Sequence, residues 1–137
     1  MILMDTHVWL WWTSLPERLS PSVRATIDNA ALDAQLAVST VSVWEIATKA
    51  ALGKLPPDIL PPEINAREWV ERASQTPGLR ILPLAPDVAL MSAELPEPFH
   101  RDPADRLIVA QARRSRATLV TADRKILDYP HVKTLWE

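Results

Sequence analysis

The chain has 137 residues, of which 47% are hydrophobic and 23% are charged, and these values predict one soluble domain over residues 1–137. Cysteine is absent and only two glycines occur, which excludes disulfides, thiolate metal sites, cysteine nucleophiles and a glycine-rich phosphate loop. No apolar run approaches the roughly 18 residues of a membrane span, and no signal peptide is recognisable, so we expect a cytoplasmic protein without membrane contact. The net charge of −2 by itself gives no sign of a nucleic-acid partner.

Strand-like and helix-like segments alternate along the first half of the chain. Residues 1–4 form a short apolar run typical of a strand, and residues 6–12 continue with helical spacing of tryptophans. Ser20 and Pro21 provide a cap and a first-turn proline for a helix over 23–32. A buried strand over 36–38 then precedes a helix over 43–52, which Gly53 ends.

The same alternation continues to the C-terminus. Asn65 caps a helix that carries Trp69, with Glu68 placed as in a capping box. The remaining predicted elements are a strand over 80–82, helices over 87–95 and 103–115, and strands over 118–121 and 132–135. Short apolar strands separated by helices indicate an α/β fold with a mainly parallel central sheet.

Four acids lie where predicted strands end or where the following helices begin. Asp5 follows the first strand, Glu45 lies in the first turn of the 43–52 helix, and Asp123 follows the 118–121 strand. Asp105 lies in the first turn of the 103–115 helix. That helix descends about 16 Å and the next strand climbs about 16 Å, so Asp105 and Asp123 return to one edge of the sheet. We therefore expect all four carboxylates to converge at this edge.

Each acid also has a structural explanation. Ser42 and Glu45 have the spacing of a capping box, Asp102 and Asp105 suit the start of a helix, and Asp123 can begin a turn. Asp5 stands inside an apolar run, where an unpaired charge is costly to bury. Several neighbouring carboxylates are tolerated if a divalent cation neutralises them, and oxygen ligands alone favour Mg²⁺, with Mn²⁺ as a substitute.

Four segments carry a family resemblance, and they occur in this order: Asp-Thr-His-Val-Trp-Leu (5–10), Ser-Thr-Val-Ser-Val-Trp-Glu-Ile (39–46), His-Arg-Asp-Pro-Ala-Asp-Arg-Leu-Ile-Val-Ala-Gln-Ala (100–112) and Leu-Val-Thr-Ala-Asp (119–123). Together they resemble the PIN-domain family, and most of all its VapC-type toxins, over essentially the whole chain. The resemblance implies a three-layer α/β/α sandwich and a Mg²⁺-dependent endoribonuclease. It also implies a homodimer that a cognate antitoxin holds silent.

By this resemblance, Asp5, Glu45 and Asp105 match the first three acids of the family's site, and Asp123 matches its less uniform fourth acid. These four are the predicted catalytic residues and metal ligands. They would position metal-activated water for hydrolysis of an RNA phosphodiester. Asp102 is an extra acid in the third motif, and we rank it as auxiliary because helix capping already explains it.

Neighbouring residues have candidate roles that the sequence leaves open. Thr6 and Thr121 either hydrogen-bond the metal-binding carboxylates or are β-branched residues suited to strand ends. Arg106 either pairs with Asp102, contacts RNA phosphate or lies on the surface. Residues 99–137 contain 8 basic and 5 acidic side chains, and Arg124 in this basic part is a candidate for RNA binding.

Two other classes of function fit an α/β fold. A phosphotransfer protein would need a second acid near Asp5, and none stands there. A catalytically silent PIN-like binding domain would be favoured if one of the four acids had been replaced, and none has been.

The partner surface is predicted from aromatic residues. Trp9, Trp11, Trp12 and Trp69 exceed the needs of a small core, so some are expected at an interface. By resemblance to the toxin family, we expect an antitoxin helix near residues 9–12 and Trp44, with an Arg or Lys directed at the acids.

Overall fold

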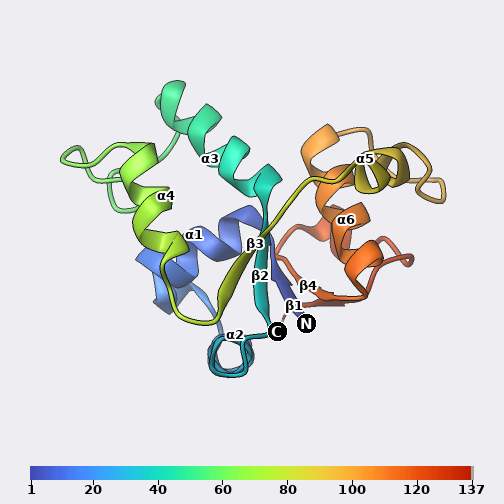
Figure 1. Ribbon diagram of the computed structural model, residues 1–137, viewed down its shortest axis with the longest axis horizontal. Helices are drawn as coiled ribbons and strands as arrows, with labels where there is room; N and C mark the ends of the chain where they lie inside the picture. The colour runs from blue at the N-terminus through green and yellow to red at the C-terminus, as the bar shows by residue number, and fades with distance from the viewer. Residues whose placement is uncertain (137) are drawn as a thin grey trace.

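Five short apolar segments form one parallel sheet in the computed structural model, which describes residues 1–136 (Figure 1). The strands are β1 (Ile2–Met4), β2 (Leu36–Ser39), β3 (Leu79–Leu82), β4 (Thr118–Val120) and β5 (Thr134–Leu135), in the order β3-β2-β1-β4-β5. Met4 at the end of β1 lies opposite Val38 of β2 and Val120 of β4. The carboxyl ends of the three central strands therefore lie side by side.

The helices begin where the sequence provides caps. They are α1 (Thr6–Ser14), α2 (Pro21–Leu32), α3 (Thr40–Ala51), α4 (Ala66–Ser74), α5 (Pro86–Ala93), α6 (Pro103–Ser115) and α7 (Arg124–Leu127), with a 3-10 helix η1 over Pro16–Arg18. The predicted caps Ser20, Asn65 and Asp102 each accept a hydrogen bond from a backbone N–H of the first turn. Among the helices of residues 1–136, none is both long and apolar enough to span a bilayer.

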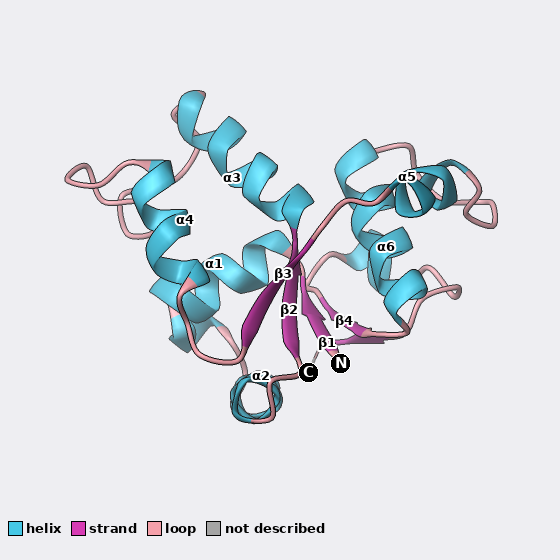
Figure 2. Cartoon of the chain, viewed as in Figure 1, coloured by secondary structure: helices cyan, strands magenta, loops and turns pink. Residues whose placement is uncertain are grey.

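Alternate residues of the central strands face two different helical layers. Leu3, Ala37 and Leu119 pack with residues of α5 and α6 in one apolar cluster. Met4, Val38 and Val120 pack with residues of α1, α2 and α4 in the other. Figure 2 shows the strands as a layer between these two groups of helices. This arrangement confirms the expected three-layer α/β/α sandwich, and the central strands of the parallel sheet are buried on both faces.

Some predicted boundaries were wrong. Helix α3 begins at Thr40 rather than at residue 43, because Ser39 at the end of β2 accepts the backbone N–H of Val41 and caps the helix directly. The last strand covers only Thr134–Leu135, and the short helices η1 and α7 were not predicted. These elements are too short for a periodic apolar pattern to reveal them.

Candidate active site

The candidate site lies where the chain changes direction across the sheet. From β1 the chain builds β2 and β3 on one side, and it returns to build β4 and β5 on the other. Ligands of open α/β sheets bind at such switch points. Asp5 caps α1 directly after β1, and Asp123 caps α7 after β4.

The other two acids come from the first turns of longer helices, with one correction. Asp105 lies in the first turn of α6, as predicted. Because α3 begins at Thr40, Glu45 lies in the second turn rather than the first. Ser42 is therefore no helix cap, and the capping box predicted for Ser42 and Glu45 is wrong. Glu45 is left without a structural role at the helix end.

Asp5 is a buried carboxyl group held by hydrogen bonds. Asp5 is 7% exposed, and both oxygens of its carboxyl group accept hydrogen bonds. The backbone N–H of Thr6 donates to Oδ1 at 2.6 Å, and the hydroxyl of Thr121 donates to Oδ2 at 2.7 Å. Within residues 1–136 no Lys or Arg forms an ion pair with it. Burial raises the pKa of Asp5 in spite of these hydrogen bonds.

A hydroxyl pair orients the carboxylate of Glu45. The Thr6 hydroxyl donates to Oε1 of Glu45 at 2.5 Å, and the buried Ser42 hydroxyl lies 2.8 Å from that of Thr6. Because the Thr6 hydroxyl donates its one hydrogen to Glu45, it accepts the hydrogen bond from the Ser42 hydroxyl. Burial, followed in smaller measure by the charge of Asp5, raises the pKa of Glu45. Thr6 and Thr121 thus hydrogen-bond the carboxylates directly, which is more than a preference for strand ends.

Asp105 experiences the charge of every other acid of the site. Burial, followed by the negative charges of the surrounding acids, raises the pKa of Asp105 to about 7. In decreasing order they are Asp102, Asp5, Asp123 and Glu45. The four predicted acids therefore lie within electrostatic range of one another.

The chemistry of this cluster fits a hard divalent cation. The donors are carboxylate oxygens, which Mg²⁺ and Mn²⁺ prefer, and a cation would relieve the repulsion that raises the pKa of Asp105. No three His, Asp or Glu side chains of residues 1–136 are arranged to hold one metal ion. Mg²⁺ keeps several of its waters and is commonly bound through one or two carboxylates, so it does not need such a group.

Two arginines predicted for RNA binding differ in their surroundings. Arg106 is 5% exposed, and its guanidinium group donates to the carbonyl oxygens of Ser92, Phe99 and His100. Its one acidic partner is Glu97 and not Asp102, at 3.3 Å. The pairing with Asp102 and the surface position are therefore wrong, and the donors of Arg106 are directed at its own chain. Contact of Arg106 with RNA stays a prediction. Arg124 is exposed and lies 3.8 Å from Asp128.

Asp102 has the structural role that the sequence predicted. Its side chain is exposed and accepts the backbone N–H of Asp105 at 3.0 Å, which caps α6. The auxiliary rank of Asp102 remains a prediction.

Sequence reasoning missed two residues of the site. Ser42 was interpreted as a helix cap, but its side chain is buried and its hydroxyl hydrogen-bonds that of Thr6. His100 was assigned no role, but its Nε2 lies 3.3 Å from Oδ2 of Asp105, is buried and has no aligned hydrogen-bond partner among the described residues. Its presence in the third motif next to the acids was the available signal.

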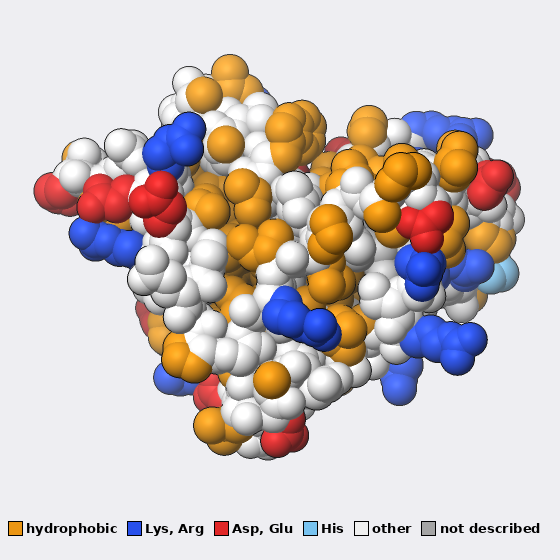
Figure 3. Space-filling model, in the orientation of Figure 1, with side chains coloured by type: hydrophobic (Ala, Val, Ile, Leu, Met, Phe, Trp, Pro, Cys, Tyr) orange, Lys and Arg blue, Asp and Glu red, His pale blue; other side chains and the backbone are white. Residues whose placement is uncertain are grey.

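The tryptophans only partly follow the prediction. Trp9 and Trp69 are core residues that meet edge to face at 5.2 Å, so neither is available to a partner. Trp11 and Trp12 are half-buried. Trp44 is 59% exposed and lines a groove of about 410 Å³ between α3 and α6. The groove is lined by Thr40, Val41, Trp44, Leu84, Pro103, Ala104 and Leu107. Figure 3 shows hydrophobic side chains gathered on both sides of the hollow between α3 and α6.

Comparison with known proteins agrees with this geometry. Residues 2–132 match the family model described as the PIN domain. Ribonuclease VapC22 of Mycobacterium tuberculosis is 34% identical over 137 residues, which cover 98% of each chain. The structure of FitAcB from Neisseria gonorrhoeae is similar with a TM-score of 0.67 and 27% identity, over 98% of this chain and 96% of that one. VapBC2 from Rickettsia felis, bound to a promoter DNA fragment, shares the fold with a TM-score of 0.66 and 19% identity over the full length of both chains.

Proposed function

The chain belongs to the PIN-domain family, and from this premise we propose that it is a divalent-metal-dependent endoribonuclease and the toxin of a toxin–antitoxin pair. The observation that carries the proposal is Asp5, a buried carboxyl without a cationic partner among residues 1–136, surrounded by further acids at the switch point of the sheet. The 34% identity to a protein named a ribonuclease supports RNA as the substrate. Family membership sets the phosphotransfer alternative aside.

The proposed metal is Mg²⁺, for which Mn²⁺ can substitute, and the residues that would hold it are Asp5, Glu45, Asp105 and Asp123. Such an ion lowers the pKa of water and stabilises negative charge that develops on a phosphate. Thr121 and Thr6 keep the oxygens of Asp5 and Glu45 in a fixed orientation by donating to them. Because the pKa of Asp105 is about 7, only part of the population carries this proton near neutral pH, and positive charge in the site favours its loss.

Cleavage of RNA by matched variants tests the nuclease. Wild type is expected to cleave single-stranded RNA with Mg²⁺ or Mn²⁺ and not with EDTA. Asp5→Asn and Asp105→Asn should each lower the cleavage rate by about 100-fold or more, because each removes charge from the site. Asp102→Asn keeps the cap of α6 and should change the rate far less.

Asp58→Asn is the matched control, because Asp58 is an exposed acid in the loop between α3 and α4. It should cleave like wild type. If Asp5→Asn retains full activity in the same preparations, the proposed nuclease site is wrong. A wild type that is inactive with both metals favours the silent binding domain.

We further propose a cognate antitoxin and a homodimer, both of which the family resemblance implies. An apolar helix of the antitoxin would pack near Trp44, and an Arg or Lys would reach Asp5, Glu45 and Asp105. The exposed ring of Trp44 and the apolar groove beside it support this contact. By occupying the acids, the antitoxin would compete with the metal.

Co-expression with a candidate antitoxin, followed by capture and a growth assay, tests the partner. Trp44→Ala should weaken capture while the chain stays folded, and Leu32→Ala, at an 84% exposed position outside the groove, should not. A chain that arrests no growth when expressed alone and captures no small partner would contradict the toxin. If light scattering instead shows that Trp44→Ala converts a dimer into a monomer, the groove is the contact with a second copy of the chain.

A further inference from the structure

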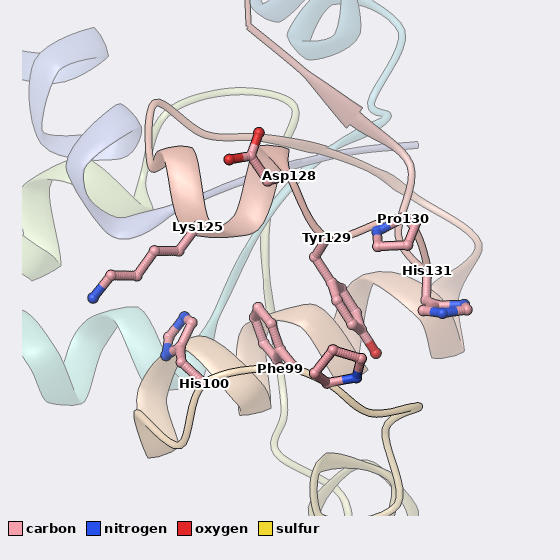
Figure 4. A pocket seen from close by; sticks show the side chains of 8 residues that line it. Phe99, His100, Lys125, Asp128, Tyr129, Pro130 and His131 are labelled. Atoms are coloured by element: carbon pink, nitrogen blue, oxygen red, sulfur yellow. The ribbon is translucent and has the colours of Figure 1, made fainter.

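A second cavity adjoins the cluster of acids. It has a volume of about 540 Å³ and is lined by Pro98, Phe99, His100, Lys125, Asp128, Tyr129, Pro130 and His131 (Figure 4). Two segments far apart in the sequence form it, the one before α6 and the one that includes the end of α7. His100 connects the cavity to the acids, since its ring lies 3.3 Å from Asp105. The volume is in the range of small-molecule sites.

The cavity contains the only phenylalanine and the only tyrosine of the chain. Phe99 and Tyr129 stack with ring centroids 4.2 Å apart, and both are buried. His131 is exposed and packs edge-on against Tyr129 at 5.2 Å. Pro98 and Pro130 are also exposed at the cavity. This lining suits a flat, apolar-faced ring.

One end of the cavity carries a free positive charge. The side chain of Lys125 extends from α7 beside His100 in Figure 4, and within residues 1–136 it forms no ion pair. The one acid of the lining, Asp128, lies 3.8 Å from Arg124, which offsets its charge. The backbone N–H of Lys125 donates to the side chain of Asp123, so the backbone from which this lysine side chain extends lies next to the acids. A phosphate group is the complement of such a cation.

The walls of the cavity are held before any ligand arrives. Arg106 binds the carbonyl oxygens of Phe99 and His100 at 3.3 and 3.2 Å, and this explains why its burial is tolerated. The Tyr129 hydroxyl donates to the carbonyl oxygen of Pro96 at 2.7 Å. A site that is already ordered loses less entropy when it binds a ligand.

We propose that this cavity binds an unstacked nucleobase of the RNA, next to the phosphate that is cleaved, with Lys125 on the phosphate of that nucleotide. The inference rests on the proposed ribonuclease function and names a part of the substrate that this function alone does not. Proteins that read single-stranded RNA hold splayed bases on aromatic and apolar side chains and bind the backbone through cations.

Nuclear magnetic resonance of the full-length chain in EDTA tests the cavity without cleavage. The probes are the four nucleoside 5′-monophosphates, with ribose 5-phosphate and inorganic phosphate as controls without a base. Because Phe99 and Tyr129 are unique, their ring signals are unambiguous. We expect nucleotides to shift the ring signals of Phe99, Tyr129 and His131 saturably, and ribose 5-phosphate to leave the Phe99 and Tyr129 signals in place.

Variants at exposed positions separate the base from the phosphate. His131→Ala should weaken binding of nucleotides but not of ribose 5-phosphate. Lys125→Ala should weaken both by up to about fivefold, as expected for an exposed charge pair. Lys133→Ala, an exposed lysine outside the cavity, should change neither.

Two results would overturn the inference: no saturable shift of these rings up to about 10 mM nucleotide, or equal shifts with ribose 5-phosphate. The result is independent of the nuclease assay. Asp5→Asn should abolish cleavage and still show the nucleotide shifts. Shifts in a chain that cleaves no RNA would support the cavity and contradict the nuclease, and cleavage without shifts would do the reverse.

Discussion

Asp105 illustrates at the scale of one residue how surroundings change a carboxyl group. Its pKa in the folded chain is about 7, whereas the ordinary value is 3.8, because the group is half-buried and faces other acids. A raised pKa means that the folded state binds the proton more tightly than the unfolded state does. The contribution of Asp105 to stability is therefore most favourable below pH 4, falls as the pH rises towards 7, and is constant above that.

This sign predicts a pH-dependent gain from Asp105→Asn. In EDTA, the variant should have nearly the stability of wild type at pH 4 and be more stable by about 2–4 kcal/mol at pH 8, because it removes a charge that folding disfavours. Urea unfolding at both pH values measures the difference. Asp58→Asn, at an exposed position, should show no such change. A difference that is the same at both pH values would contradict the raised pKa.

At the scale of elements, the two glycines of the chain both have positive φ but very different surroundings. Gly53 follows α3 at φ +66°, and a Cβ atom there would meet nothing within 4 Å. Gly78 precedes β3 at φ +83°, and a Cβ atom there would lie 1.8 Å from the carbonyl oxygen of Ala31 in α2. Because glycine has no Cβ atom, Gly78 lets the turn before β3 approach the backbone of α2 this closely.

Alanine at the two positions should separate backbone strain from lost space. Gly53→Ala should cost about 1–2 kcal/mol, the strain of a left-handed residue with a side chain. Gly78→Ala should cost at least about 2 kcal/mol more, since the backbone of α2 or of the turn must move. Urea unfolding of the pair gives both values. Equal costs would show that the turn moves freely away from Ala31.

At the scale of the whole molecule, the four acids are brought together only by folding. Asp5 caps α1 and Glu45 lies in α3, whereas Asp105 lies in α6 and Asp123 caps α7, which follow much later in the chain. A cation that binds this cluster should bind the folded state alone and raise its stability by mass action.

Millimolar Mg²⁺ or Mn²⁺ should therefore raise the melting temperature of wild type by several degrees, about 3–5 °C for each kcal/mol of stabilisation. The rise should disappear in Asp5→Asn, which lacks the most buried charge of the cluster, and should persist in Asp58→Asn. Calorimetry with and without metal measures it. A rise of the same size in all three proteins would indicate unspecific binding and contradict a shared site.

Much of this protein was predictable from its sequence because the relevant signals are local. Apolar runs of strand length alternate with capped helices, and these patterns depend on hydrogen bonds and periodicity within a few residues. Ser20, Asn65 and Asp102 cap their helices as expected. The order of strands and helices also places acids at the carboxyl ends of parallel strands, and the apolar neighbours of Asp5 already indicated its burial.

The tertiary structure alone decided the contacts between distant segments. Arg106 lies beside two acids in the sequence, yet its partners belong to residues 92–100, so its burial depends on how that loop packs. Of the tryptophans, packing buries Trp9 and leaves Trp44 exposed. The cavity that Phe99 and Tyr129 line was likewise decided by packing, because its walls come from segments far apart in the sequence. The physical reason is that burial, and the pKa shift it causes in Asp105, belong to the environment that other parts of the chain create, which no local pattern contains.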